Sequence, residues 1–400
     1  MTEVLSNVDY MALEEAHSSG VYAKRALTIV RGCGAYLWDA DGNRYIDCVG
    51  GQGAANVGHA HPKVVAAIQA QAGILISCPE LFYNDQRALL LQKLTDLAEM
   101  PRAFLCNSGA EAVEAALKFA RFATGRTHIV AAMRGFHGRT MGALSATWEP
   151  KYREPFAPLV PNYSHVPFND LDAAEAAITE ATAAVMVEVV QGEGGVHPAE
   201  PDYLHGLQAL CHQRGALFIV DEVQTGFGRT GRMFAHQHYG LAPDLMPVAK
   251  SIAGGMPFGA CLIGERVGKL QPAIHGTTFG GNPLGCAAAL ATLEVLLEED
   301  LPGRAAALGD FLMGRLGDLP QRFRAQVRKV RGLGLLFGIE LRSKVAPVLK
   351  ALQAKGVLAL PAGLNVLRLL PPLVISQADL EQVAAAIEAV FQEIGPASTD

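Results

Sequence analysis

The stretch "ALFIVDEV", residues 216–223, decides the fold class, because an uninterrupted apolar run ends there in two acidic residues. Runs of the same kind recur along the middle of the chain, at "AFLC" (103–106), "HIVAAM" (128–133), "AAVMVEVV" (183–190), "DLMPVA" (244–249) and "GACLIG" (259–264). Continuous apolar runs without alternation predict strands that are covered on both faces, as in a mostly parallel sheet. Helical stretches separate the runs, so the pattern predicts a doubly wound α/β fold.

The C-terminal part of the chain follows a different pattern. The stretches "RGLGLLFGIEL" (331–341) and "VLRLLPPLVI" (366–375) predict strands. A helix is expected to open at "SQAD", where Ser376 and Asp379 have the spacing of a capping box, and to stop at Gly395-Pro396. This mixture is typical of a small α+β domain.

A chain of 400 residues is long enough for one large domain and a smaller one. We predict a large domain over residues 61–290 and a smaller α+β domain. The smaller domain combines an N-terminal segment, residues 1–60, with residues 291–400.

Charge and hydropathy exclude two classes of partner. The net charge of −6 comes from 39 acidic and 33 basic residues, with no basic tract, which argues against nucleic acid. No apolar run approaches the ~20 residues that a membrane span needs. The acidic start "MTEVLSNVDYMALEE" is unlike a secretory or transit peptide.

Seven cysteines are scattered along the chain without any C-x-x-C pair, at positions 33, 48, 78, 106, 211, 261 and 286. The odd number and the wide spacing favour free thiols in a reducing compartment over a disulfide framework. We therefore expect a cytoplasmic protein. Two short histidine pairs, "GHAHP" and "HQH", lack a completing acid or cysteine cluster, so no metal site is predicted.

One lysine, Lys250, stands alone at the end of an apolar run, in "DLMPVAKSIAGG" (244–255). An unpaired ammonium is costly to bury. Such a lysine is therefore paired, exposed at its tip while its stem covers apolar surface, or used chemically.

The segment "CNSGAEAVEAALKFAR" (106–121) predicts a helix with Ser108 as its cap. Gly109 and Ala110 leave the first backbone N–H groups unobstructed, and a helix N-terminus of this kind can hold a phosphate. Taken alone, the segment equally fits an ordinary capped helix. The chain contains no Walker-type phosphate loop.

The segment "FIVDEVQTGFGRTG" (218–231) places Asp221 at the end of a strand. A carboxylate buried there needs a cationic partner, and either a protonated ring nitrogen of a cofactor or an arginine would serve. "GFGRTG" matches the dinucleotide fingerprint G-x-G-x-x-G literally, but "DEVQT" separates it from the strand, so the match is weak.

Three further segments could line a site. In "RGFHGRT" (134–140), Phe136 or His137 could stack on a planar ring, and Arg139 could clamp a carboxylate. "VEVVQGEGG" (187–195) places Glu188 and Glu193 at another strand end, and "HGTTFGGNPLG" (275–285) offers Thr277 and Thr278 to an anion. Each segment alone fits an ordinary turn or loop. Together the segments supply what pyridoxal phosphate requires, namely a lysine, an acid for the ring nitrogen and phosphate donors.

At these residues the chain resembles the class III aminotransferases of pyridoxal phosphate fold type I, in particular the acetylornithine and ornithine aminotransferase group. The likeness extends from about residue 30 to residue 375 and includes "NSGAEA", "FHGRT", "QGEGG", "DEVQTGFGRTG" and "GTTFGGNP". It implies a large domain with a mostly parallel seven-stranded sheet and a smaller α+β domain.

The resemblance also implies roles for individual residues. Lys250 would hold the coenzyme covalently and, once released by the incoming amine, would move the proton. The implied contacts to the coenzyme involve Asp221 at the pyridinium nitrogen, Gln224 near the ring hydroxyl, Phe136 on the ring face, Ser108, Gly109 and Ala110 at the phosphate, and Thr278 at the phosphate from the other subunit of a homodimer. For the substrate, Arg368 would bind the α-carboxylate of glutamate, Arg139 the remaining carboxylate, and Glu193 would cover Arg368 when an ω-amine reacts.

The segment "MRGFHGRTMGALSATWEPKYREPF" (133–156) resembles the branch that acts on carrier-protein-bound aminoadipate semialdehyde in lysine biosynthesis. The expected reaction moves the ω-amino group of an N-capped ornithine or lysine to 2-oxoglutarate, in arginine or lysine biosynthesis. The cap would be an acetyl group or a small acidic amino-group carrier protein. Alternatives are an ornithine or 4-aminobutyrate transaminase, a decarboxylase or an aminomutase of the same class, or a dehydrogenase that uses "GFGRTG".

Overall fold

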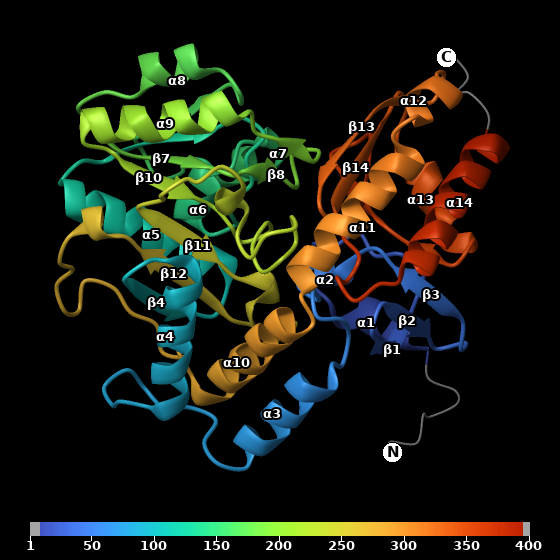
Figure 1. Cartoon of the computed structure of the whole chain (residues 1–400), viewed down its shortest axis with the longest axis horizontal. Helices are drawn as coiled ribbons and strands as arrows, with labels where there is room; N and C mark the ends of the chain where they lie inside the picture. Colours follow the sequence, from blue (N-terminus) through green and yellow to red (C-terminus); the bar gives the residue numbers. More distant parts are fainter. Residues whose placement is uncertain (1–8, 395–400) are drawn as a thin grey trace.

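The computed structural model describes residues 9–394 of the chain. Figure 1 shows two parts side by side, which we call the large lobe (left) and the small lobe (right). The large lobe is built on one seven-stranded sheet, whereas the small lobe contains two four-stranded sheets. Within the described residues, no helix is long and apolar enough to cross a membrane.

The seven-stranded sheet has the order β4-β12-β11-β10-β7-β5-β6. Its strands are β4 (Arg102–Cys106), β5 (His128–Ala132), β6 (Tyr163–Val166), β7 (Thr182–Val187), β10 (Leu217–Val220), β11 (Leu245–Val248) and β12 (Gly259–Ile263). Only β12 runs antiparallel to its neighbours, so the predicted mostly parallel sheet is confirmed. The strand missing from the prediction is β6, an edge strand whose sequence "YSHV" carries polar residues and no apolar run.

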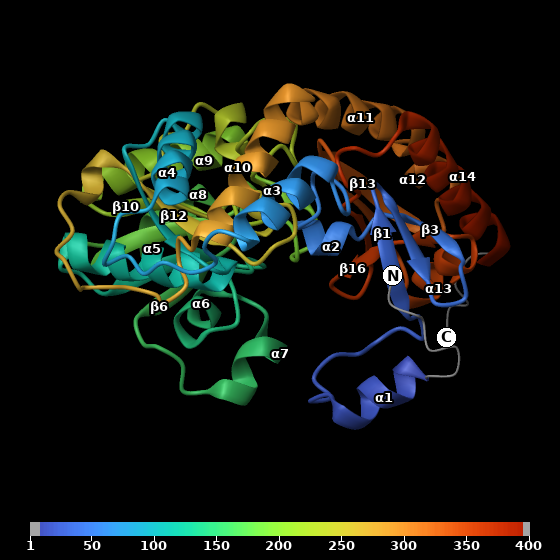
Figure 2. The same cartoon turned by 90° about the horizontal axis from the view of Figure 1, so that it is seen from below.

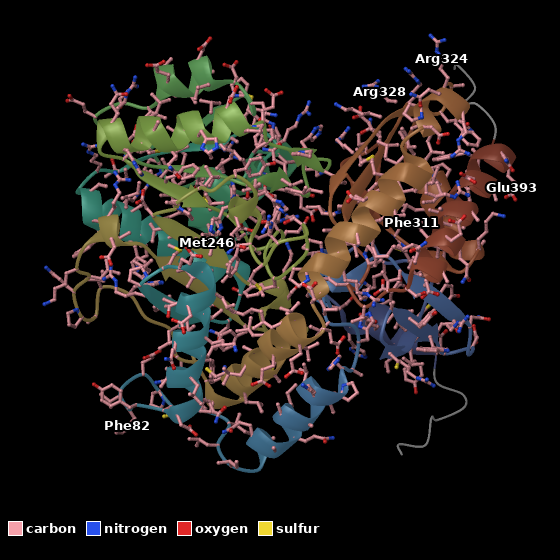
Figure 3. All side chains as sticks on the ribbon, viewed as in Figure 1. Phe82, Met246, Phe311, Arg324, Arg328 and Glu393 are labelled. Carbon is pink, nitrogen blue, oxygen red and sulfur yellow. The ribbon has the colours of Figure 1, made fainter. Side chains whose placement is uncertain are left out.

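Both faces of this sheet are covered, which explains the continuous apolar runs. Phe218 packs in a core that includes residues of helix α9 (Pro201–Arg214), while its neighbour Leu217 packs in a core with residues of α5 (Gly109–Thr124). Met246 lies in the interior of the large lobe, as Figure 3 shows. Successive side chains of one strand thus enter different cores.

The small lobe joins the two ends of the chain. One sheet, of order β1-β2-β3-β15, combines strands from both ends, and the other has the order β13-β14-β17-β16. The strands are β1 (Ile29–Cys33), β2 (Tyr36–Asp39), β3 (Arg44–Asp47), β13 (Val327–Leu333), β14 (Leu336–Leu341), β15 (Val357–Leu358), β16 (Leu360–Ala362) and β17 (Val366–Leu369). The domain limits at residues 60 and 290 stay a prediction. The stretch 331–341 is not one strand but belongs to a hairpin, because the chain turns at Gly334, whose φ is +55°.

The predicted C-terminal helix is α14 (Gln377–Ile394). Ser376 Oγ accepts from the Asp379 N–H at 3.0 Å, and Asp379 Oδ2 accepts from the Ser376 N–H at 3.4 Å, so the capping box is confirmed. Its expected stop at Gly395-Pro396 lies outside the described residues.

A fourth, two-stranded sheet pairs β8 (Val190–Gln191) with β9 (His197–Pro198). The structure contains further α-helices besides α5, α9 and α14. They are α1 (Tyr10–His17), α2 (Gly50–Gly53), α3 (Pro62–Ala72), α4 (Asp85–Ala98), α6 (Met141–Ala146), α7 (Pro150–Arg153), α8 (Leu171–Ala177), α10 (Pro283–Glu298), α11 (Leu301–Leu316), α12 (Leu319–Arg322) and α13 (Ala346–Ala354). Figure 2 shows α7 protruding from the large lobe on the same side of the molecule as α1.

Candidate active site

The carboxyl ends of the parallel strands meet at one edge of the large sheet, where open α/β folds bind ligands. The segments that follow β4, β5, β7, β10 and β11 contribute side chains or backbone to one cavity of about 190 Å³. Its walls are formed by Gly109, Ala110, Phe136, His137, Gly138, Glu188, Glu193, Asp221, Val223, Gln224 and Lys250. Residues that are more than 100 positions apart in the sequence are therefore brought together, and most of the predicted coenzyme ligands are among them.

Lys250 occupies the turn directly after β11, at the start of a short 3₁₀ helix, η3 (Lys250–Ala253). Its φ of +42° lies in the left-handed region, which L-residues seldom adopt outside functional sites. Within residues 9–394 its amine has no hydrogen bond or ion pair. Burial lowers the pKa of Lys250; the carboxylate of Glu193 opposes this shift and the guanidinium of Arg368 adds to it. A lysine with a lowered pKa is a better nucleophile and base near neutral pH.

Asp221 has a buried histidine as its partner. His137 Nδ1 lies 2.7 Å from Asp221 Oδ2, and both side chains are almost fully buried. Burial lowers the pKa of His137, but the hydrogen bond and the charge of Asp221 raise it by more, so the net shift is upward. The sequence left open whether an arginine or a ring nitrogen of a cofactor pairs with Asp221. Within the described part of the chain the partner is a histidine, His137. Of the two residues considered for stacking on a planar ring, His137 is hydrogen-bonded to Asp221, so Phe136 remains the candidate.

Glu188 connects two of the loops that line the cavity. Its carboxylate accepts from the backbone N–H of Phe136 at 3.1 Å and from that of Gly192 at 3.3 Å. Burial raises the pKa of Glu188 to about 7, with His137 lowering it and Asp221 raising it to smaller extents. The sequence located this acid at a strand end but gave it no role; the same signal, an acid directly after a buried strand, had singled out Asp221.

The N-terminus of α5 forms another wall of the cavity. Ser108 caps the helix by accepting from the Glu111 N–H at 3.2 Å. The N–H groups of Gly109 and Ala110 have no partner within a helix that begins there. A side chain at position 109 would put its Cβ 2.7 Å from Val223, so only glycine allows this close approach. Such a helix end can bind a phosphate group.

Arg368, on β17 of the small lobe, contacts two residues that line the cavity, Glu193 and Gln224. Its Nη2 lies 2.7 Å from Glu193 Oε1, and its Nη1 donates to Gln224 Oε1 at 3.2 Å. Burial raises the pKa of Glu193, but the positive charges of Arg368 and Lys250, together with side-chain hydrogen bonds, lower it by more, so the net shift is downward. At position 192 a Cβ would lie 1.7 Å from Gln224 Oε1, so any larger residue there would displace the side chain of Gln224.

An outer cavity of about 530 Å³ adjoins the inner one and shares Phe136 and Glu193 with it. Exposed residues such as Lys151 and Arg328 line it, so it reaches the molecular surface. Beside it, Arg139 is exposed, with its Cζ 3.5 Å from the centroid of the Tyr152 ring and 5.6 Å from that of Phe136.

Thr278 does not line either cavity of this single chain. It is exposed, and its neighbour Thr277 accepts from Asn107 Nδ2 at 3.0 Å, close to the start of α5. The contact of Thr278 with the phosphate of a coenzyme bound in a second subunit stays a prediction.

The glycine segment 226–231 does not form a dinucleotide site. No α-helix follows it; the next element is a short 3₁₀ helix, η2 (Ala235–His238). Arg229 is buried and donates to Leu335 O at 3.0 Å and to Pro371 O at 2.6 Å, so the segment ties the two lobes together. The dehydrogenase alternative therefore loses its structural basis. Among the described residues, no group of three or more His, Cys, Asp and Glu could hold a metal ion.

Comparison with known proteins identifies the family. The family model described as aminotransferase class-III matches residues 19–391. The chain belongs to the class III aminotransferases. It is an aminotransferase, and the PLP-dependent chemistry is that of its family.

The relatives of this aminotransferase are close. It is 49% identical to the LysW-aminoadipate semialdehyde transaminase of Deinococcus radiodurans, over 97% of this chain and 91% of the relative. It is 43% identical to the acetylornithine aminotransferase of Methanocaldococcus jannaschii, over 98% of this chain and 100% of the relative. The ornithine aminotransferase of Toxoplasma gondii, crystallised with partial occupancy of PLP, superposes with a TM-score of 0.93 at 34% identity, over 96% of this chain and 94% of the other.

The chemistry of the inner cavity fits pyridoxal phosphate. It combines a lysine amine without a partner among residues 9–394, a buried carboxylate supported by a histidine, and the N-terminal end of a helix. These are the three groups that the coenzyme's aldehyde, ring nitrogen and phosphate require. The ring face would pack against Phe136, which lines the same cavity.

Proposed function

We propose that this aminotransferase moves the ω-amino group of an N-capped ornithine or lysine to 2-oxoglutarate, giving a semialdehyde and glutamate. The observation that carries the proposal is the ion pair of Glu193 with Arg368 beside Lys250, together with a second arginine, Arg139, which contacts Tyr152 of the outer cavity. One pocket with these groups can accept two kinds of amino substrate.

The two arginines account for the pair of substrates. Glutamate has a carboxylate on the reacting carbon, which Arg368 would bind after Glu193 moves away. An ω-amine has no carboxylate there, and Glu193 then neutralises the buried guanidinium, since an unpaired buried charge is costly. In both cases Arg139 would bind the carboxylate at the far end of the substrate.

We propose that pyridoxal phosphate, when bound, supplies the aldehyde that accepts the amino group and a ring that withdraws electrons from the reacting carbon. Gly109 and Ala110 would hold its phosphate, with Ser108 as the cap of that helix. Asp221, oriented by His137, would keep a proton on the ring nitrogen. Lys250 Nζ, with its lowered pKa, would take the proton from the reacting carbon and return it.

The cap on the substrate is proposed to be an acetyl group or an amino-group carrier protein. The relatives named for acetylornithine and for the LysW conjugate support both choices. Because the outer cavity reaches the surface, a large cap could stay outside while the ω-amine enters.

We further propose a homodimer with shared active sites, to which Thr278 contributes. Exposed apolar side chains near this residue support an interface: Leu81, Phe82 and Tyr83 on one segment and Phe279 on the other. Arg87 holds both segments, donating to Phe82 O and to Gly281 O at 2.9 Å each. Figure 3 shows Phe82 at the edge of the large lobe.

The test is a comparison of kcat/KM for acetylornithine, ornithine, acetyllysine, 4-aminobutyrate and carrier-linked lysine, each with 2-oxoglutarate as acceptor. We expect a capped diamine to have the highest value. A higher value for free ornithine or 4-aminobutyrate would reassign the substrate, and no glutamate from any capped diamine would refute the proposal. Release of carbon dioxide, or turnover without an acceptor, would indicate a decarboxylase or an aminomutase.

A further inference from the structure

Tyr152 lies at the outer cavity on the short helix α7, which protrudes from the large lobe in Figure 2. Its ring has contacts with two residues of the preceding "FHGRT" turn. The guanidinium of Arg139 lies 3.5 Å from the ring centroid, and the ring of Phe136 meets it edge to face at 6.1 Å and 83°. A single aromatic side chain thus touches the candidate stacking residue and the candidate carboxylate ligand.

The contact of Tyr152 with Arg139 does not itself use any N–H group of the guanidinium as a hydrogen-bond donor to another residue. A guanidinium can stack with its flat face while its N–H groups, in the same plane, bind a carboxylate. Within residues 9–394 Arg139 has no hydrogen bond or ion pair, and its guanidinium lies near the rings of Tyr152 and Phe136. Without the ring, an exposed arginine would sample many rotamers, and ordering it would reduce the affinity for a carboxylate.

The position of Tyr152 is itself fixed relative to the turn. The Trp148 N–H donates to Gly135 O at 2.9 Å, which holds the start of the segment that leads to α7 against "FHGRT". Lys151 adds a second cation, with its Nζ 4.8 Å from the centroid of the Tyr152 ring. The ring is therefore held beside the turn by backbone and side-chain contacts.

We propose that Tyr152 is a positioning residue that orders Arg139 and so makes the enzyme select substrates with a carboxylate at the end distant from the reacting amine. This inference rests on the proposed role of Arg139 as the ligand of that carboxylate. Tyr152 acts through Arg139 and touches no reacting atom.

The test uses a double-mutant cycle on the coenzyme-loaded enzyme, with glutarate as the ligand and calorimetry as the readout. Y152L should weaken glutarate binding about threefold to thirtyfold, the range expected for loss of one cation–π contact. In the R139A background, Y152L should have little further effect, because the residue through which it acts is absent. Y152F keeps the ring and should restore the affinity.

A matched control removes the same kind of contact elsewhere. Arg121 lies 5.2 Å from the ring centroid of Tyr163, which lines neither the inner nor the outer cavity. Y163L should therefore leave glutarate affinity unchanged. Kinetics provide a second readout: Y152L should raise KM for glutamate and acetylornithine, but not for alanine or N-acetylputrescine, which lack the distant carboxylate.

Equal effects of Y152L in the wild-type and R139A backgrounds would overturn the inference, and so would the absence of glutarate binding by the wild type. Glutarate binding does not require turnover, so these results are separate from the proposed function. A wild type that binds glutarate but transaminates no capped diamine would refute the proposed function. The double-mutant cycle of Y152L and R139A would still test the role of Tyr152.

Discussion

The carboxylate of Glu193 lies 2.7 Å from the guanidinium of Arg368, although the first residue belongs to the large lobe and the second to the small lobe. Glu193 lines the inner cavity together with Lys250, and both residues of the pair shift the pKa of Lys250. Any substrate that places a carboxylate on Arg368 has to displace Glu193 first. If Arg368 and Glu193 have the proposed roles, the pair should separate substrates according to whether the reacting carbon carries a carboxylate.

We expect E193Q to lower kcat/KM for acetylornithine by about tenfold, since the loss of one charge partner leaves Arg368 buried and unneutralised. The value for glutamate should change less, because glutamate supplies its own carboxylate. Half-reaction rates of the wild type and E193Q with each amino donor measure how much each donor is affected. A fall of the same size for both donors would show that Glu193 does not discriminate between them.

R368A should act in the opposite sense. Removal of the guanidinium takes away a charged hydrogen bond to glutamate, which corresponds to about tenfold to a hundredfold in affinity. Acetylornithine, with no carboxylate at the reacting carbon, should be affected much less. The comparison of KM for the two donors checks this prediction, and equal losses would contradict the two-arginine scheme.

K250A should abolish turnover while the protein still binds pyridoxal phosphate noncovalently, because the α5 N-terminus and Asp221 remain. Absorbance of the dialysed protein and borohydride reduction followed by peptide mapping measure both properties. In the wild type the reduced adduct should map to Lys250. An adduct on another lysine, or near-wild-type rates in K250A, would disprove the assignment.

H137F should reduce turnover about tenfold to a hundredfold, since Asp221 would lose a buried charged hydrogen bond of 2.7 Å. The variant should also release the coenzyme faster, because the carboxylate that faces it is no longer oriented. Stopped-flow half-reactions and coenzyme retention after gel filtration test this. H137Q, which can still donate to Asp221, serves as the control and should lie between H137F and the wild type.

Glu188 should make stability depend on pH. Its pKa is about 7 in the folded protein against an ordinary value of 4.5, so the folded state binds the proton more tightly than the unfolded state. Its destabilising effect is absent below the ordinary value and complete above pH 7, which amounts to a loss on the order of 3 kcal/mol as pH rises from 5 to 8. Urea titrations of the wild type and E188Q at both pH values isolate this group. A constant difference between the two proteins would refute the prediction.

Much of the fold was readable from the sequence because buried parallel strands require continuous apolar runs. Runs such as 216–223 predicted six of the seven strands of the large sheet. The acids and glycines that follow these runs predicted that the candidate site lies at the carboxyl ends of the strands. The edge strand β6 was missed because it is only partly buried and can carry polar residues. The hairpin at Gly334 was missed because a short apolar stretch with glycines fits one strand or two.

The residue types at the strand ends, and with them Lys250, Asp221 and the cap of α5, follow from the order of residues along the chain. Their partners follow from the packing of the folded chain. The bond of His137 to Asp221, the pairing of Glu193 with Arg368 and the stacking of Arg139 on Tyr152 each depend on how separate loops pack. Periodicity records whether a residue is buried, but a hydrogen bond depends on distances of a few tenths of an ångström between distant segments.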